Sequence, residues 1–116
     1  MLVAQCGAPF LQPEILQHAL IGIRQHWLRA ATFLTAVPSY YGGVHAFVLA
    51  VDRHAMIDVP SAVLDARFAA SGIATHHYTP ALHHAAFVLP RWITELTLAD
   101  SHVPRKLLAA DTVIDV

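Results

Sequence analysis

The feature that most restricts the fold of this 116-residue chain is a pair of apolar segments joined by a short, glycine-containing connection. Ala31–Val37 mixes β-branched and aromatic residues and stops at a proline, and Val44–Val51 is a second run of the same kind. Such runs favour strands. Because the connecting segment Pro38–Gly43 is short and ends in two glycines, we expect an antiparallel hairpin with an open loop.

The segments before the hairpin extend this order to strand, helix, strand, strand. Leu2–Gln5 has the composition of a buried strand. From Pro13 to about Leu28, apolar residues recur at helical spacing, and proline suits the first turn of a helix. The first half of the chain therefore predicts a mixed α/β arrangement with one amphipathic helix.

Prolines and glycines divide the second half of the chain. A helix preceded by Asp58 or Val59 is expected, with Pro60 in its first turn and its end near Gly72, because glycine commonly follows the last turn of a helix. A short strand is expected around Ala74–His77. One or two short helices are expected between residues 80 and 96.

The composition is typical of one domain and is unusually poor in charged residues. A chain of 116 residues can form one core but not two. Hydrophobic residues make up 56% of it and charged residues 13%, whereas average soluble domains carry about 25% charged residues. The shortage of charge suggests that a partner or further chain covers part of the surface. A net charge of −1 gives no electrostatic reason to expect nucleic-acid binding.

The single cysteine and the lengths of the apolar runs bear on the compartment. Cys6 has no second cysteine with which to form an internal disulfide, so a reducing environment is expected. The first residues lack the basic start and long apolar stretch of a signal peptide. No apolar run reaches the roughly 18 residues needed to span a bilayer. We therefore expect a cytoplasmic protein with no membrane partner.

Four segments give the chain a resemblance to a known family. They are the loop 38–43 with the run that follows it, the segment Tyr78–Pro90, and the shorter stretches Val3–Gln5 and Ala66–Gly72. Together they resemble the C-terminal part of the polyamine aminopropyltransferases (spermidine synthases). The resemblance covers residues 1–100, and residues 101–116 form a divergent tail.

The resemblance implies an α/β fold class, namely the C-terminal portion of a Rossmann-like, methyltransferase-type sheet. In that architecture the last hairpin strand inserts antiparallel between the two strands that precede it. The family transfers an aminopropyl group from decarboxylated S-adenosylmethionine, a co-substrate, to putrescine. No separate cofactor is implied.

Two polar residues are the candidate substrate-binding residues. Gln5 ends the first predicted strand, and Tyr40 follows the end of the second. Because ligands of open α/β sheets collect at the carboxyl ends of strands, topology brings both to one edge. The resemblance implies that they line the pocket for a putrescine-type diamine. The alternatives are a loop-capping amide for Gln5 and a half-buried loop aromatic for Tyr40.

No catalytic residue is assigned in this chain. An alkyl amine with a pKa of about 10 is protonated at neutral pH, so a carboxylate must take up a proton before the nitrogen can attack. The resemblance implies an aspartate upstream of the matched region, together with a glycine-rich turn for the nucleoside, and neither motif occurs here. Acidic residues such as Glu14, Asp52 and Asp58 are not expected beside Gln5 or Tyr40. We therefore expect the chain alone to be inactive.

The histidine-rich segment 76–84 is not expected to form a metal site. Adjacent histidines point in different directions, and a closed site needs about four converging ligands. His83 matches a histidine that is usual in the family, whereas His77 and Thr79 replace a tyrosine and an asparagine. Packing or surface roles are expected for these residues.

Two hypotheses follow from the sequence. The first is a truncated spermidine synthase-like protein that supplies the putrescine side of the pocket and works with an N-terminal half. The second is a non-catalytic remnant that acts as an oligomerisation or partner-binding module. The high apolar content and the open edge of the strand Leu2–Gln5 are the observations behind the second hypothesis.

Overall fold

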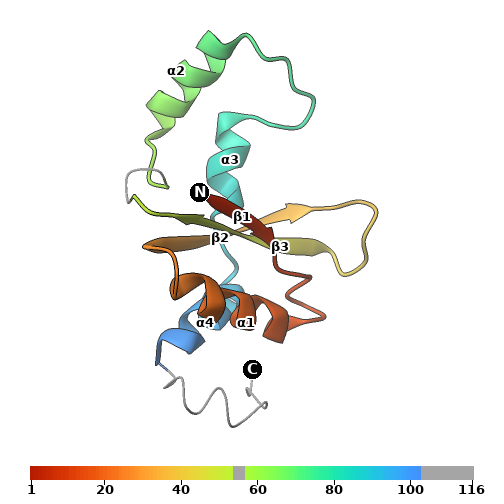
Figure 1. The fold of residues 1–116 in the computed structure, drawn as a ribbon. Helices are drawn as coiled ribbons and strands as arrows, with labels where there is room; N and C mark the ends of the chain where they lie inside the picture. The colour runs from red at the N-terminus through yellow and green to blue at the C-terminus, as the bar shows by residue number, and fades with distance from the viewer. Residues whose placement is uncertain (54–56, 103–116) are drawn as a thin grey trace.

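The computed structural model describes residues 1–53 and 57–102 and contains a three-stranded sheet (Figure 1). Its strands are β1 (Leu2–Gln5), β2 (Arg29–Ala36) and β3 (Val44–Val51), in the order β1-β3-β2. β3 is antiparallel to both neighbours, so β1 and β2 run parallel to each other. The predicted insertion of the last hairpin strand between the two earlier strands is confirmed.

The hairpin pairs over its full length. Arg29 lies opposite Val51 at one end, and Ala36 lies opposite Val44 at the other. The bounds predicted for β3 are confirmed, whereas β2 begins two residues earlier than predicted and ends one earlier. Pairing with β3 explains the shift, because each residue of β2 then has a partner across the ladder.

Two helices cover one face of the sheet. They are α1 (Pro13–Arg24) and α4 (Arg91–His102), which lie together against the sheet in Figure 1. The predicted end of the first helix near Leu28 was wrong, because the backbone turns through Gln25 to enter β2. The core between these layers consists of fully or almost fully buried side chains: Cys6, Leu16, Leu20, Ala46, Val48 and Ile93.

The opposite face of the sheet is only partly covered. Side chains alternate between faces along a strand, so Phe47 points away from the core that buries Ala46 and Val48. Phe33 of β2 stacks on Phe47 with ring centroids 5.3 Å apart, and the ring centroid of Phe87 also lies 5.3 Å from that of Phe33. Val3, on the edge strand β1, remains 54% exposed.

The remaining helices extend from this second face. α3 (Pro80–Ala86) begins at Thr79, whose hydroxyl accepts a hydrogen bond from the Leu82 amide at 3.0 Å. α2 (Ser61–Ser71) packs chiefly on α3 and contains no buried residue. It begins later than predicted, with Pro60 before its first residue, and Gly72 follows its end as predicted.

The strand predicted around Ala74–His77 was wrong. This segment is an exposed, irregular connection between α2 and α3, and none of the strands in residues 1–53 and 57–102 pairs with it. The Thr75 hydroxyl instead donates to the Tyr78 carbonyl at 2.7 Å. The prediction of one or two helices after it is confirmed, since two are present, and α4 continues past residue 96 to His102. The rest of the predicted tail lies outside the described residues.

Candidate functional site

Gln5 and the start of the Tyr40 loop lie at the same edge of the sheet. Gln5 is the last residue of β1 and sits opposite Phe47 of β3. Tyr40 follows β2, where its amide donates to the Val37 carbonyl at 2.9 Å in a turn. Because β1 and β2 are parallel, their carboxyl ends meet at one edge, as the sequence predicts.

The loops that follow β1 and β2 are packed against each other. Gly42 approaches the first loop so closely that a Cβ atom at this position would lie 2.8 Å from Leu11 Cδ1 and 3.0 Å from Ala8 Cβ. Gly42 also has φ of 94°, which disfavours other residues. This contact ties the Tyr40 loop to the loop that begins after Gln5.

Tyr40 is partly accessible to solvent. Its side chain is half-exposed, with the ring centroid 5.1 Å from that of His45, which is 5% exposed. Tyr41, by contrast, is 91% exposed. The sequence did not point to His45. Only the strand register shows that His45 lies next to the Tyr40 loop and on the same face of the sheet as Phe47.

Two of the acidic residues named in the sequence, Asp52 and Asp58, lie away from this edge. Asp52 follows the end of β3, which is antiparallel to β1 and β2 and therefore ends at the opposite edge. Asp58 forms an ion pair with Arg29 at the beginning of β2, also at the opposite edge. Glu14 lies in the first turn of α1. Asp52 and Asp58 are therefore not positioned beside Gln5, whereas Glu14 lies at the start of the helix that follows the loop after Gln5.

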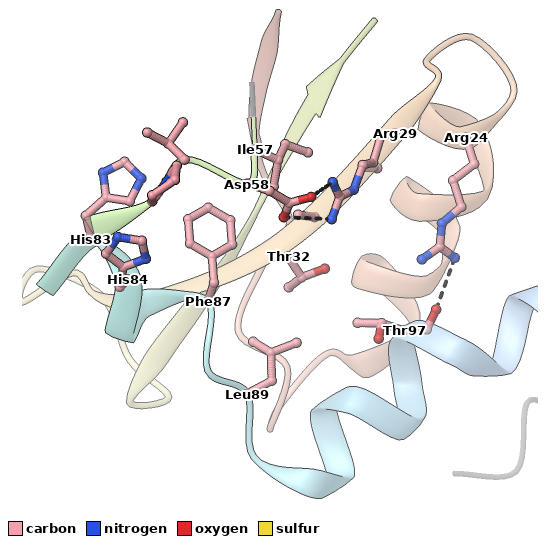
Figure 2. A pocket seen from close by; sticks show the side chains of 14 residues that line it. Arg24, Arg29, Thr32, Ile57, Asp58, His83, His84, Phe87, Leu89 and Thr97 are labelled. Atoms are coloured by element: carbon pink, nitrogen blue, oxygen red, sulfur yellow. Dashed lines mark hydrogen bonds and ion pairs between the residues drawn. The ribbon is translucent and has the colours of Figure 1, made fainter. Parts of the chain in front are cut away.

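A pocket of about 610 Å³ lies at that opposite edge, where β2 begins (Figure 2). Polar side chains line it, with His83 and His84 on one side, Arg24 on the other, and Arg29 and Asp58 between them. Neither Gln5 nor Tyr40 belongs to its lining. Sequence reasoning did not anticipate this pocket, since its walls come from segments far apart in the chain.

Two arginines link the segments that line this pocket through hydrogen bonds. The two terminal nitrogens of the Arg29 guanidinium donate to the Asp58 carboxylate, Nη2 to Oδ1 at 3.0 Å and Nη1 to Oδ2. This hydrogen bonding raises the pKa of Arg29, with burial acting in the opposite direction. Arg24 donates to the Thr97 carbonyl at 3.0 Å and joins α1 to α4. These interactions hold the segment before α2 and the two covering helices in place.

The histidine-rich segment forms part of an aromatic cluster. The Tyr78 hydroxyl and His83 Nδ1 lie 2.9 Å apart, and the His83 ring also contacts the rings of His84 and Phe87. Tyr78 in turn contacts Phe68 of α2. In the part of the chain that the structure describes, no three histidine, cysteine or acidic side chains are grouped to hold a metal ion.

The environment of His83 predicts a pH-dependent stability. Burial, and secondarily the charge of His84, lower the pKa of His83 from its ordinary value of 6.5. The folded chain then binds this proton less readily than the unfolded chain, so the stabilisation is complete above pH 6.5 and is lost as the pH falls through the lowered pKa. Urea unfolding from about pH 7.5 to about pH 5 should show a smaller loss of stability in His83→Phe than in the parent. Equal pH profiles in the two proteins would contradict this, and His77→Phe serves as the exposed control.

The described helices include none that is long and apolar enough to cross a bilayer. No protein-family model matches the chain. Similar curated proteins do exist. The chain is 36% identical over 95 residues to the polyamine aminopropyltransferase of Shigella boydii and, over the same length, to that of Escherichia fergusonii. It is 35% identical to the protein of that name from Escherichia coli strain K12 / DH10B.

These matches cover 82% of this chain but 33% of each relative, so the chain spans about a third of their length. Two solved structures are similar in fold: spermidine synthase from Thermotoga maritima, with a TM-score of 0.68, and a spermidine synthase in complex with the transition-state analogue AdoDATO, with a TM-score of 0.69. Each is 18% identical and matches 82% of this chain, which corresponds to 32% of the solved chain. The fold class predicted from the sequence is confirmed.

Proposed function

Because this chain corresponds to a segment of the polyamine aminopropyltransferase family, we propose that it supplies the diamine-binding side of an aminopropyltransferase active site. The proposed substrate is a putrescine-type diamine. The proposed reaction moves an aminopropyl group onto one of its nitrogens to give spermidine.

The shared edge of Gln5 and Tyr40 is the observation that carries this proposal. The Gln5 amide oxygen and the Tyr40 hydroxyl are hydrogen-bond acceptors for an ammonium group, and an aromatic face tolerates a cation above it. The close contact between the two loops at Gly42 supports a defined position of the Tyr40 loop relative to the loop after Gln5. A diamine has two cationic ends and an apolar middle, which suits acceptors placed around a ring.

The chemistry of transfer requires groups beyond this edge. In the proposed step the amine nitrogen forms a bond to the sulfonium-bound carbon, the carbon–sulfur bond breaks, and the thioether leaves with the electron pair. The nitrogen must first lose a proton to a carboxylate. Since Asp52 and Asp58 lie at the opposite edge, we propose that a second polypeptide, equivalent to the N-terminal part of the relatives, supplies the carboxylate and the nucleoside site.

A complementation assay tests this function. The chain is mixed with the part of the Escherichia coli relative that it does not match, and transfer from decarboxylated S-adenosylmethionine to putrescine is measured. We expect transfer from the mixture and none from either part alone. In the mixture, Tyr40→Ala should raise the KM for putrescine about tenfold or more through loss of the cation–ring and hydroxyl contacts.

Tyr41→Ala is the matched control, because its ring is 91% exposed in the same loop and should leave KM unchanged. A mixture that forms a complex but shows no transfer would refute the proposed function. So would turnover by the chain alone, since the second polypeptide would then be unnecessary.

The second candidate function is an oligomerisation or partner-binding module. β1 pairs on one side only within the described sheet, and Val3 on this strand is half-exposed. An apolar strand edge of this kind can pair with another chain. Sedimentation of the chain alone separates the two functions: a stable homo-oligomer that does not dissociate when the second polypeptide is added would favour the module.

A further inference from the structure

We propose that His45 is a further amine-binding residue of this site, and that it sets the preference for a diamine over a monoamine. The inference rests on the proposed function. It concerns the second cationic end of the substrate, with Gln5 and Tyr40 holding the first.

Strand register places His45 beside both candidate residues. Gln5 lies opposite Phe47, and His45 precedes Phe47 by two positions on the same face of β3. His45 is therefore one step nearer the loops at the edge of the sheet. Its ring centroid lies 5.1 Å from that of Tyr40, with the planes inclined by 55°. Gln5 and His45 thus share one face of the sheet, and the Tyr40 ring contacts His45 at the same edge.

The imidazole of His45 has an unused hydrogen-bonding atom. Its side chain is 5% exposed, and Nδ1 is buried without a hydrogen-bond partner among the described residues. A buried polar atom without a partner destabilises a fold, and an apolar ring of the same shape would avoid that loss. A residue retained under this penalty fits a role in binding.

An alkylammonium group is the chemistry that matches this atom. In a neutral imidazole, one ring nitrogen accepts a hydrogen bond, and an ammonium group has only donors. The adjacent Tyr40 ring is half-exposed, and amine binding at His45 requires this ring to rotate so that a ligand reaches His45 from solvent. The second ammonium of the diamine then reaches Nδ1 while the first is held by Gln5 and Tyr40.

Binding by the full chain tests the assignment. Putrescine and n-butylamine are titrated separately into the parent protein and into His45→Phe, and backbone amide NMR shifts near Gln5 and Tyr40 are followed. We expect His45→Phe to bind putrescine about tenfold more weakly, to bind n-butylamine as the parent does, and to melt at a higher temperature. His45→Asn, which keeps an acceptor near the position of Nδ1, should recover part of the affinity for putrescine.

The matched control is His18→Phe, the same change on the exposed surface of α1, which should alter neither affinity. If the parent responds to putrescine but His45→Phe responds equally well, the role of His45 is refuted while the proposed function stands. Equal losses for both amines, together with a lower melting temperature, would show a structural role only and would also refute it. A parent protein with no saturable response to putrescine would refute both.

Discussion

Leu20→Ala is expected to lower the free energy of unfolding by about 2–5 kcal/mol. Leu20 is fully buried where α1 packs on the sheet, in the same cluster as Leu16 and Val48. The change removes buried apolar atoms and leaves a cavity that rigid neighbours fill only in part. Small domains have total stabilities of about 5–15 kcal/mol, so this loss is a large fraction of the whole.

Urea unfolding followed by circular dichroism measures this effect. Leu28→Ala is the matched control, because Leu28 is 60% exposed and should change the stability by no more than about 0.5 kcal/mol. Similar losses for the two variants would mean that α1 does not pack on the sheet as described.

Gly42→Ala is expected to destabilise the chain by about 2–4 kcal/mol, from overpacking together with an unfavourable left-handed backbone. The new Cβ would lie 2.8 Å from Leu11 Cδ1 and 3.0 Å from Ala8 Cβ. The exposed Leu11 side chain can move away, but Ala8 is 4% exposed and its Cβ is fixed by the backbone. The Tyr40 loop must therefore shift, and diamine binding should weaken with it.

Gly43→Ala separates the two causes. Gly43 also has a positive φ, of 76°, but a Cβ there would meet nothing within 4 Å. Gly43→Ala should lower the free energy of unfolding only by the cost of the left-handed backbone, about 1–2 kcal/mol, and should leave amine binding nearly unchanged. If the two variants behave alike in unfolding and binding, the contact between the two loops does not position Tyr40.

The features predictable from sequence are those set by local pattern and topology. The run Val44–Val51 was bounded correctly because a proline-to-glycine connection and a β-branched composition define a hairpin strand. The shared edge of Gln5 and Tyr40 followed from strand direction alone, before any side-chain position was known. The assignment of these two residues to substrate binding stays a prediction.

The features that sequence missed depend on tertiary packing. The segment Ala74–His77 was expected to be a strand from its composition, but it has no neighbouring strand within the described part of the chain, and a strand needs a partner for its backbone groups. His45 gave no signal, because burial beneath Tyr40 appears only when the loop folds over β3. The ion pair of Arg29 with Asp58 joins positions 29 residues apart, with no local pattern to link them.

The position of α2 outside the core has a consequence for how the chain unfolds. With no buried residue of its own, α2 is held mainly through α3 and the contact of Phe68 with Tyr78. Segments with few buried contacts open with a smaller free-energy change than the whole domain. Amide protons of α2 should thus exchange with solvent deuterium through local opening, independently of the slower cooperative unit formed by the sheet, α1 and α4.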